Sequence, residues 1–253
     1  MHNLLAIDIG NTSITSGLFT NSKLIKKWRI KTDKNKSVKS YISAYKSILE
    51  NKKITDVVIS SVVPQLDKIF VKVSQALCQK NPVFLNYKNC PIKIKYKKRW
   101  QIGADRLANT IAGLKISGSP LIIIDFGTAI TFDCVNKKGE YIGGIILPGI
   151  EISSYALHSY TAKLPLVKFS RPKNIIGTTT QEGIKSGFYF GYIGMLKYLI
   201  ENLKKKLKCD KIIATGGYSN LFTKKLKIKA YPDLTLIGLK LFFENLNGGG
   251  EQK

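Results

Sequence analysis

The stretch LLAIDIGNTSIT, residues 4–15, decides how the rest of the chain is interpreted. An apolar run ends in Asp8, a Gly-Asn-Thr sequence follows, and apolar residues then return in alternation with polar ones. This pattern predicts a β-strand, a tight turn and a second strand. A hairpin accounts for the glycine, but it does not explain why a buried strand ends in a carboxylate.

The same pattern returns as LIIIDFGTAIT at residues 121–131, where it is one residue shorter. Asp8 and Asp125 are 117 residues apart, close to half of the 253-residue chain. Self-similarity over such a distance predicts a duplicated domain. We expect a boundary near residues 117–120, with an N-terminal domain of residues 1–117 and a C-terminal domain of residues 118–253.

Alternating strands and helices surround both copies of this pattern. The first copy opens a meander of three antiparallel strands over residues 3–30, and the pattern then predicts a helix at 33–51, a strand at 55–63, a helix at about 65–80 and a strand at 82–85. The second copy opens another meander, followed by helices and a strand at 211–217. The predicted fold class is α/β, with a mixed sheet in each half and a cleft between the halves.

The two turns after the carboxylates suit phosphate binding. Glycine lets backbone N–H groups approach phosphate oxygens, and the hydroxyls of Thr12 and Thr128 add donors. A carboxylate at the end of each strand can hold a cation that bridges the phosphates. Each motif alone is weak, but two copies at matching places in a repeat favour a nucleotide site.

A third motif, GADRLANTIAG at residues 103–113, lies between the two copies and predicts a helix that runs to about residue 114. Asp105 falls in its first turn, where an acidic residue is favoured, and Arg106 would then form a surface ion pair. A second interpretation follows from the phosphate turns. The carboxylate of Asp105 can accept the proton of an attacking hydroxyl, and Arg106 can bind a substrate carboxylate.

Composition narrows the classes of function. The formal charge of +25 raises the question of nucleic-acid binding, but only four of the 41 cationic residues are arginine, and the lysines are spread along the chain. We therefore expect a solvated lysine surface and no nucleic-acid partner. Four scattered cysteines and two histidines argue against a disulfide framework or a zinc site. Without a secretory or membrane-spanning segment, the expected location is the cytoplasm.

The motifs, taken in order, resemble those of the type III pantothenate kinase family. They are DIGNT (8–12), Tyr96 followed by GADR (103–106), DFGTAIT (125–131), GGIILPGI (143–150), Thr180 with the Ser-Gly at 186–187, IATGG (213–217) and DLTLIGL (233–239). The family belongs to the superfamily of acetate kinases, sugar kinases, heat-shock chaperone ATPases and actin. The resemblance therefore implies two ribonuclease-H-like domains. It also implies transfer of a phosphoryl group from ATP to the 4′-hydroxyl of pantothenate, the first step of coenzyme A synthesis, by a homodimer.

The resemblance also implies a role for each matching residue. On the side that binds ATP, the resemblance implies that Asp8 supports Mg²⁺ and that Gly10, Asn11 and Thr12 surround the phosphates. It further implies that Asp125 is a ligand of a monovalent cation (K⁺ or NH₄⁺) and that Thr128 contacts ATP. The pantothenate side comprises Tyr96, Gly103, Ala104, Asp105 as general base, Arg106, and Thr180 reaching across the dimer interface. The chain departs from the family at Thr179 and Gly183, where Asn and Ala are common. Thr180 could instead cap a helix.

Other functions are compatible with parts of this pattern. A kinase of the same superfamily could act on a different alcohol or carboxylate. A ribonuclease-H-like nuclease could use Asp8, Asp105 and Asp125 on two metal ions, although it has no need of paired phosphate turns. A nucleic-acid-binding regulator could keep the fold, although intact carboxylates disfavour it. Two smaller features complete the pattern: GGYSN (216–220) resembles a nucleotide-side turn, and GGGEQK (248–253) predicts a frayed tail.

Overall fold

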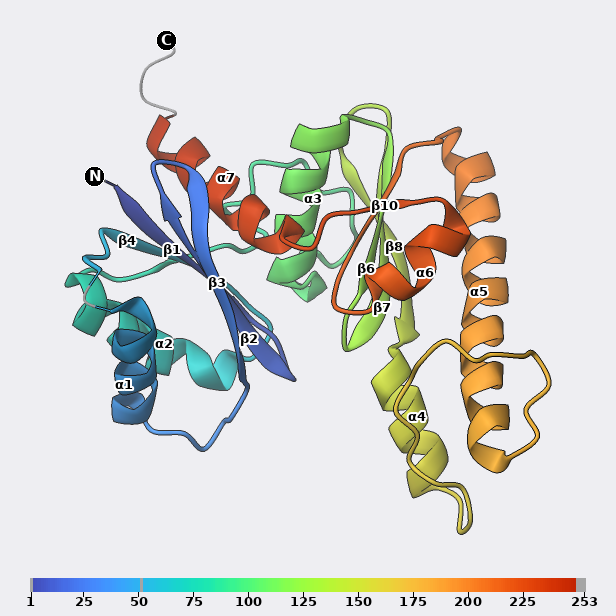
Figure 1. The fold of residues 1–253 in the computed structure, drawn as a ribbon. Coiled ribbons are helices and arrows are strands. Elements are labelled where there is room, and N and C mark those ends of the chain that lie inside the picture. The colour runs from blue at the N-terminus through green and yellow to red at the C-terminus, as the bar shows by residue number, and fades with distance from the viewer. Residues whose placement is uncertain (1, 51, 249–253) are drawn as a thin grey trace. The chain divides into compact units, whose positions relative to one another are not determined.

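Each half of the chain builds one five-stranded mixed sheet (Figure 1). The computed structural model describes residues 2–50 and 52–248, which form two compact units. Unit 1 holds the residues up to Ile116 together with those from Asp233 on, and unit 2 holds Ser117–Pro232.

The sheet of unit 1 has the strand order β3-β2-β1-β4-β5. Its strands are β1 (Asn3–Ile9), β2 (Ser13–Thr20), β3 (Lys23–Lys31), β4 (Asp56–Ser61) and β5 (Val83–Phe84). The first three form the predicted antiparallel meander, and β4 and β5 continue it in parallel with β1. The tight turn between β2 and β3 places Asn21 and Ser22 at positive φ, which twists the two strands in the direction that a hairpin requires.

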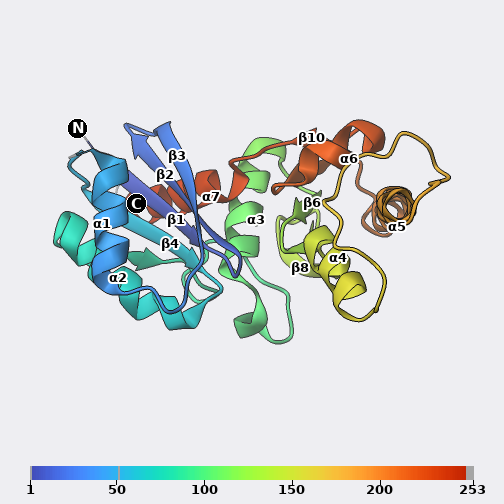
Figure 2. The same ribbon diagram turned by 60° about the horizontal axis from the view of Figure 1, so that its bottom comes forward.

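Helices cover both faces of this sheet (Figures 1 and 2). Helices α1 (Val38–Leu49) and α2 (Pro64–Cys78) lie on one face, and α7 (Leu234–Gly248) lies on the other. Helix α3 (Ala104–Ser117) packs against α7 and is preceded by a 3₁₀ turn, η1 (Arg99–Gln101). Alternate side chains of β1 pack against Tyr41 and Tyr45 of α1 and Phe70 of α2, all fully buried. Helix α7 packs on β1 and β4.

The predicted helix at 33–51 begins later than expected, at Val38. Residues before it form a turn instead, in which the side chain of Asp33 accepts a hydrogen bond from the N–H of Asn35 at 2.9 Å. Ser37 then caps the helix by accepting the N–H of Ser40 at 3.2 Å. Local side-chain bonds of this kind compete with helical ones and fix where a helix starts.

The sheet of unit 2 has the order β10-β9-β6-β7-β8. Its elements are β6 (Leu121–Phe126), β7 (Ala129–Val135), β8 (Tyr141–Pro148), α4 (Ile150–Ser159), α5 (Thr180–Leu207), β9 (Ile212–Thr215), α6 (Ser219–Leu226) and β10 (Lys229–Ala230). The ring of Phe126 stacks on Phe222 of α6 at 5.3 Å, in a core shared with Tyr189 and Leu196 of α5.

The two sheets have the same topology. In each, a three-stranded antiparallel meander is extended by two parallel strands on the side of its first strand, so β6 in unit 2 corresponds to β1 in unit 1. The predicted α/β fold with a mixed sheet in each half is confirmed. The predicted duplication is therefore visible in the strand order as well as in the sequence.

The observed division of the chain differs from the predicted one in its last helix. The expected C-terminal domain, residues 118–253, includes α7, whereas α7 groups with unit 1. Its apolar residues are buried there, and Gly238 lies so close to the carbonyl group of Ala108 in α3 that a Cβ would collide with it. The hydroxyl of Thr235 also donates to the side-chain oxygen of Asn109 at 2.7 Å.

Two further expectations concern the C-terminal tail and membrane-spanning helices. Apart from Gly248, which ends α7, the predicted frayed tail lies outside the described residues. In the part of the chain that the structure describes, every helix is too short or too polar to cross a bilayer.

Candidate functional site

Asp8 lies near the end of β1, between hydroxyl-bearing residues on both neighbouring strands. Its register partners are Thr15 on β2 and Ser60 on β4. The hydroxyl of Ser60 donates to Oδ1 of Asp8 at 2.5 Å. This hydrogen bond helps to orient the carboxylate of Asp8.

Asp125 occupies the equivalent place in unit 2. Its register partners are Thr131 on β7 and Thr215 on β9, so a half-buried carboxylate again stands between two hydroxyl-bearing residues. The one-residue difference between the two motifs is absorbed in the turn that follows each carboxylate. The structure thus confirms that the repeat extends to the surroundings of the two carboxylates.

The first turn, residues 10–12, is held by backbone hydrogen bonds. The N–H of Gly10 donates to the carbonyl of Ser13 at 3.1 Å, and the hydroxyl of Thr32, just beyond β3, donates to the carbonyl of Gly10 at 2.6 Å. Asn11 and Thr12 are exposed at its tip. The turn is therefore fixed at its base while its tip presents backbone and side-chain polar groups to solvent.

The second turn is enclosed by glycines from two other segments. The N–H of Gly149 donates to the carbonyl of Thr128 at 3.1 Å, and a Cβ at Gly149 would collide with that oxygen. Gly216, at φ +90°, lies against Asp125, and a Cβ there would collide with Oδ1 of the carboxylate. The motifs GGIILPG and GGYSN thus supply backbone that closely surrounds Asp125 and Thr128.

A hydrogen bond also joins the two segments around this second turn. The hydroxyl of Tyr218 donates to Oε1 of Glu151 in the first turn of α4 at 2.5 Å. The N–H of Tyr218 donates to the carbonyl of Phe126 at 3.3 Å, which ties the segment to the end of β6. Neither side chain was singled out by sequence reasoning, because only the glycines around them form a recognisable pattern.

Asp105 stands in the first turn of α3, as predicted, and it does form a local hydrogen bond there. Its Oδ1 accepts the N–H of Arg106 at 2.8 Å, and its carboxyl group folds back over Gly103, where a Cβ would collide with it. Burial raises the pKa of the Asp105 carboxyl, and the N–H and positive charge of Arg106 partly oppose that rise. A raised pKa makes this carboxylate a stronger base than an ordinary aspartate.

The position of Arg106 contradicts one of its two interpretations, the surface ion pair. Its side chain is 8% exposed, so it is not a surface residue, and the surface ion pair is excluded. A buried guanidinium is suited to recognising a carboxylate through paired hydrogen bonds.

Contacts within unit 1 bring Asp105 to the same edge of the sheet as Asp8. The N–H of Val62, which follows β4, donates to the carbonyl of Ile9 at 3.0 Å, next to Asp8. The side chain of Val62 in turn lies against Gly103, with Cγ1 3.3 Å from the position of an added Cβ. The first phosphate turn and the GADR motif are therefore neighbours, although about ninety positions separate them in the sequence.

The remaining predicted residues lie on other segments. Tyr96 is half-buried in the segment between β5 and η1, and Ala104, which is buried, begins α3. Thr180 is exposed at the start of α5, but it is not the N-cap: Thr179 has that role, with its hydroxyl accepting the N–H of Glu182 at 3.2 Å. The capping interpretation of Thr180 is therefore wrong.

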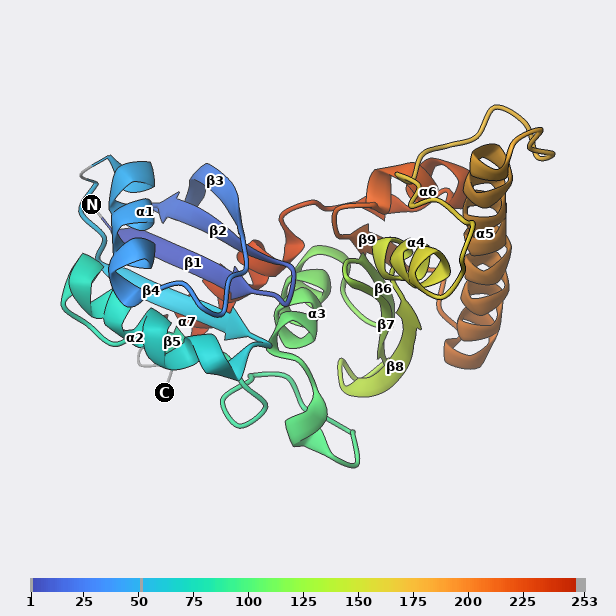
Figure 3. The ribbon, with the colours of Figure 1, turned by 90° about the horizontal axis from the view of Figure 1, so that it is seen from below.

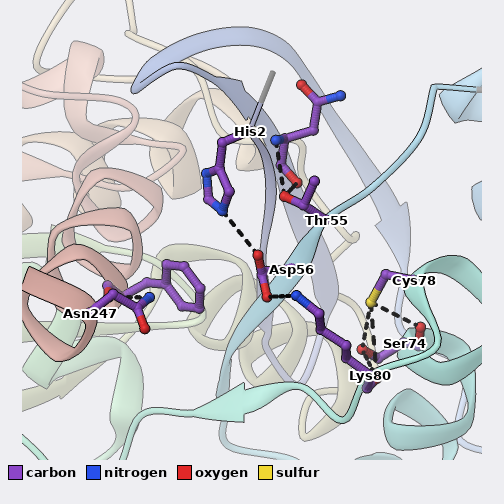
Figure 4. A network of polar contacts seen from close by, with 9 residues as sticks. His2, Thr55, Asp56, Ser74, Cys78, Lys80 and Asn247 are labelled. Atoms are coloured by element: carbon purple, nitrogen blue, oxygen red, sulfur yellow. Dashed lines mark hydrogen bonds and ion pairs between the residues drawn. The ribbon is translucent and has the colours of Figure 1, made fainter.

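A surface cavity of about 440 Å³ opens elsewhere on unit 1, at the end of the sheet where β1 and β4 begin. Figure 4 shows the polar network beside it, in which Asp56 accepts hydrogen bonds from His2 at 2.9 Å and from Lys80 at 2.8 Å. Burial raises the pKa of Asp56, but these two partners outweigh it and the pKa is lowered. Because Asp8 lies at the other end of β1, this cavity is separate from the candidate site.

Solved structures share the fold of the chain. A Baf family protein from Campylobacter jejuni has a TM-score of 0.61 at 19% identity, with 96% of this chain and 99% of that one covered. The ethanolamine utilization protein EutJ from Carboxydothermus hydrogenoformans has a TM-score of 0.54 at 13% identity, with 96% and 90% covered. At these identities the likeness concerns the fold alone. The duplicated sheets, with one carboxylate at the end of the first strand of each, define the class of two-sheet α/β folds to which the chain belongs.

Sequence comparison defines the family within that class. A model of type III pantothenate kinase matches residues 4–202. A type III pantothenate kinase from Persephonella marina is 42% identical over 240 residues, which cover 92% of this chain and 94% of that protein. Another, from Solibacter usitatus, is 38% identical over 250 residues, which cover 95% and 96%. The chain belongs to the type III pantothenate kinase family, and the resemblance seen in its motifs is confirmed.

Proposed function

We propose that this chain transfers the γ-phosphoryl group of ATP to the 4′-hydroxyl of pantothenate, the first step of coenzyme A synthesis. Family membership over most of the chain supports the reaction. The structural observation that carries it is the position of Asp105, a half-buried carboxylate with a raised pKa at the same sheet edge as Asp8 and the first phosphate turn.

Asp105 acts as the general base in this proposal. An aspartate is too weak a base to remove an alcohol proton in advance, but it can accept that proton while the phosphoryl group moves through a loose, metaphosphate-like transition state. The raised pKa of Asp105 favours this transfer. Its hydrogen bond to the N–H of Arg106 would hold the carboxyl group in place while it accepts the proton of the acceptor hydroxyl.

Pantothenate is a carboxylate, and the residues around Asp105 suit it. Arg106 would bind the substrate carboxylate, with Tyr96, Gly103 and Ala104 completing the pocket. The absence of a side chain at Gly103 lets the Asp105 carboxyl fold back and lets a ligand approach the backbone.

Cations would be held by the two strand-end carboxylates. Mg²⁺ is commonly bound by one or two carboxylates together with phosphates and water, and no fuller cage is required. In residues 2–50 and 52–248 no three acidic, histidine or cysteine side chains gather around one point, so each cation would be held by a single carboxylate together with phosphates and water. Asp8 would support Mg²⁺, Asp125 would bind K⁺ or NH₄⁺, and the two ions would neutralise phosphate charge. Gly10, Asn11, Thr12 and Thr128 would contact the phosphates of ATP.

A homodimer forms part of the proposal. Large apolar side chains are exposed on β8, α4, the segment before α5 and α5 itself: Ile146, Ile152, Tyr155, Tyr160, Leu166, Ile175, Ile176 and Tyr198. Such a concentration of exposed apolar surface is typical of an interface. Thr180, at the start of α5, would reach the pantothenate pocket of the second copy.

We place the enzyme in the cytoplasm. The four cysteines Cys78, Cys90, Cys134 and Cys209 are all free, as a reducing compartment maintains them.

The test is an ATP-dependent phosphorylation assay with pantothenate, run with and without K⁺ and Mg²⁺, in which the product is identified by mass and by ³¹P coupling to the 4′-carbon. Turnover that requires both ions is expected. Turnover of a different alcohol or carboxylate, with none of pantothenate, would assign another kinase of the class. Mg²⁺-dependent cleavage of nucleic acid without kinase activity would assign the nuclease.

A further inference from the structure

Four cationic side chains are gathered in the five residues before the exposed Trp100: Lys95, Lys97, Lys98 and Arg99, here called the cationic loop. All four are exposed, and Trp100 is 64% exposed. The segment is held at both ends, since Ile94 and Ile102 are only 5% and 7% exposed. The loop is thus a projecting segment between two buried anchors.

The charge of this loop is not compensated locally. Elsewhere in unit 1, Lys26 pairs with Glu50, Lys27 with Asp233 and Lys80 with Asp56. Within the described ranges, 2–50 and 52–248, none of the four loop cations takes part in an ion pair. An uncompensated cluster in a projecting loop creates a local positive potential that attracts anions.

The loop leads directly into the candidate site. The N–H of Gln101 donates to the carbonyl of Lys98 at 3.0 Å, and the N–H of Ile102 donates to that of Arg99 at 3.2 Å, which folds the end of the loop into η1. Gly103 and Asp105 follow immediately in the chain. Figure 3 shows the segment before α3 projecting away from the sheet of unit 1. The charge is therefore carried on the chain segment that enters the proposed pantothenate pocket.

We propose that the cationic loop captures the carboxylate of pantothenate electrostatically and raises its concentration beside Asp105 before Arg106 binds it. This inference rests on the proposed function. Three of the four cations are lysines, which are hydrated point charges on flexible stems and suit transient attraction more than fixed recognition. Clustered charge of this kind raises association rates and local ligand concentration by about 10 to 10³, with a strong dependence on salt.

The test compares two variants with the same loss of charge. In the loop variant, Lys95, Lys97, Lys98 and Arg99 are replaced by Gln. In the control variant, four exposed lysines of α5 and α6 are replaced by Gln: Lys205, Lys206, Lys224 and Lys225. The loop variant leaves Tyr96 and the GADR residues untouched. Steady-state kinetics are measured with pantothenate and with its uncharged primary amide, at low and high ionic strength, and pantothenate binding is measured by calorimetry.

At low ionic strength the loop variant is expected to lose about tenfold in kcat/KM for pantothenate, a magnitude at the lower end of electrostatic steering. Its kcat is expected to stay at the wild-type value. The difference from wild type closes at about 0.5 M salt, where charges are screened over a few ångströms. The uncharged amide is expected to be turned over equally well by both proteins, and the control variant to match wild type with both substrates.

Each other outcome overturns a defined part of the argument. An equal loss with the uncharged amide means that the loop makes structural contacts and does not act through charge. An equal loss in the control variant assigns the effect to the net charge of the protein. Wild-type kinetics in the loop variant remove the loop from the reaction while the proposed function stands. A wild-type protein that neither binds nor phosphorylates pantothenate overturns both proposals.

Discussion

At the scale of single residues, Asp105 has a structural role at the start of α3 and a proposed role as general base, and substitution can separate the two. In Asp105→Asn the amide oxygen can still accept the N–H of Arg106, so the start of α3 is retained. The amide cannot accept a proton, and turnover is expected to fall by a factor of about 10² to 10⁴. ATP binding, measured by calorimetry, is expected to remain close to wild type.

Asp67→Asn is the matched control for this substitution. Asp67 is also half-buried in the first turn of a helix, where it accepts the hydroxyl of Ser61 at 2.6 Å, and burial likewise raises its pKa. Asp67 has no proposed role in the reaction, so the turnover of the Asp67→Asn variant should match that of wild type. Wild-type turnover in Asp105→Asn would remove Asp105 from the role of general base.

The raised pKa of Asp105 also predicts how turnover depends on pH. The base must be unprotonated, so kcat falls as the pH drops through the pKa of Asp105. Burial raises this pKa, and the N–H and charge of Arg106 limit the rise. The acidic limb of the profile, where kcat falls, should therefore lie at a higher pH than an ordinary aspartate would give. A pH profile of kcat checks this. The limb should persist in Asp67→Asn and be absent from the residual activity of Asp105→Asn.

Gly216 gives a second prediction at this scale. In Gly216→Ala the new Cβ would collide with Oδ1 of Asp125, and it would lie only 2.6 Å from the backbone N of Phe126. We expect a loss of stability on the order of 3 kcal/mol, together with weaker activation by K⁺, because Asp125 is displaced. Gly139→Ala is the control. Gly139 also has positive φ, at +73°, but no atom lies within 4 Å of its Cβ, so only the backbone cost of about 1–2 kcal/mol should appear in thermal unfolding.

At the scale of elements, we expect adjacent threonines at the start of α5 to have different roles. Thr179→Ala removes the N-cap hydroxyl that accepts the N–H of Glu182, and is expected to cost about 1 kcal/mol in the free energy of unfolding with an unchanged KM for pantothenate. Thr180→Ala should do the reverse, raising that KM with little effect on unfolding. Equal effects of the two substitutions on KM would show that Thr180 acts only through the position of the helix.

Many of the strands and helices, and the shared topology of the two halves, could be predicted from the sequence. Hydrophobic alternation and turn residues located the three-stranded meanders, and the repeat of Asp8 at Asp125 indicated that the two halves share one topology. Ser60 and Thr215 could not be assigned to the carboxylates in advance, because the pairing of β4 with β1 and of β9 with β6 is a long-range contact. The place of α7 was missed for the same reason: its sequence shows an apolar helix but not the sheet that it covers.

At the scale of the whole molecule, the proposed dimer can be tested on its exposed apolar surface. Ile176 is 78% exposed, so Ile176→Glu removes little packing within the chain. Burying the new carboxylate in an interface is costly, and we expect a monomer by sedimentation velocity at micromolar concentration. The KM for pantothenate should rise, because Thr180 would no longer be supplied by the second copy.

Ile25→Glu is the control for the dimer. Ile25 is 42% exposed on β3 of unit 1, outside the apolar surface of unit 2. This variant should sediment as wild type does. A wild-type protein that is already monomeric and active would contradict the dimer proposal.

The grouping of α7 with unit 1 has a consequence for how the protein is made. Unit 2 is one continuous stretch, Ser117–Pro232, whereas unit 1 needs a helix translated after all of unit 2. Until the ribosome has released α7, the face of β1 and β4 that buries Leu236, Leu239 and Phe242 has no cover. Domains synthesised first usually fold first. Because of this connectivity we expect the reverse order here, with the half that emerges second completing its structure before the half that emerges first.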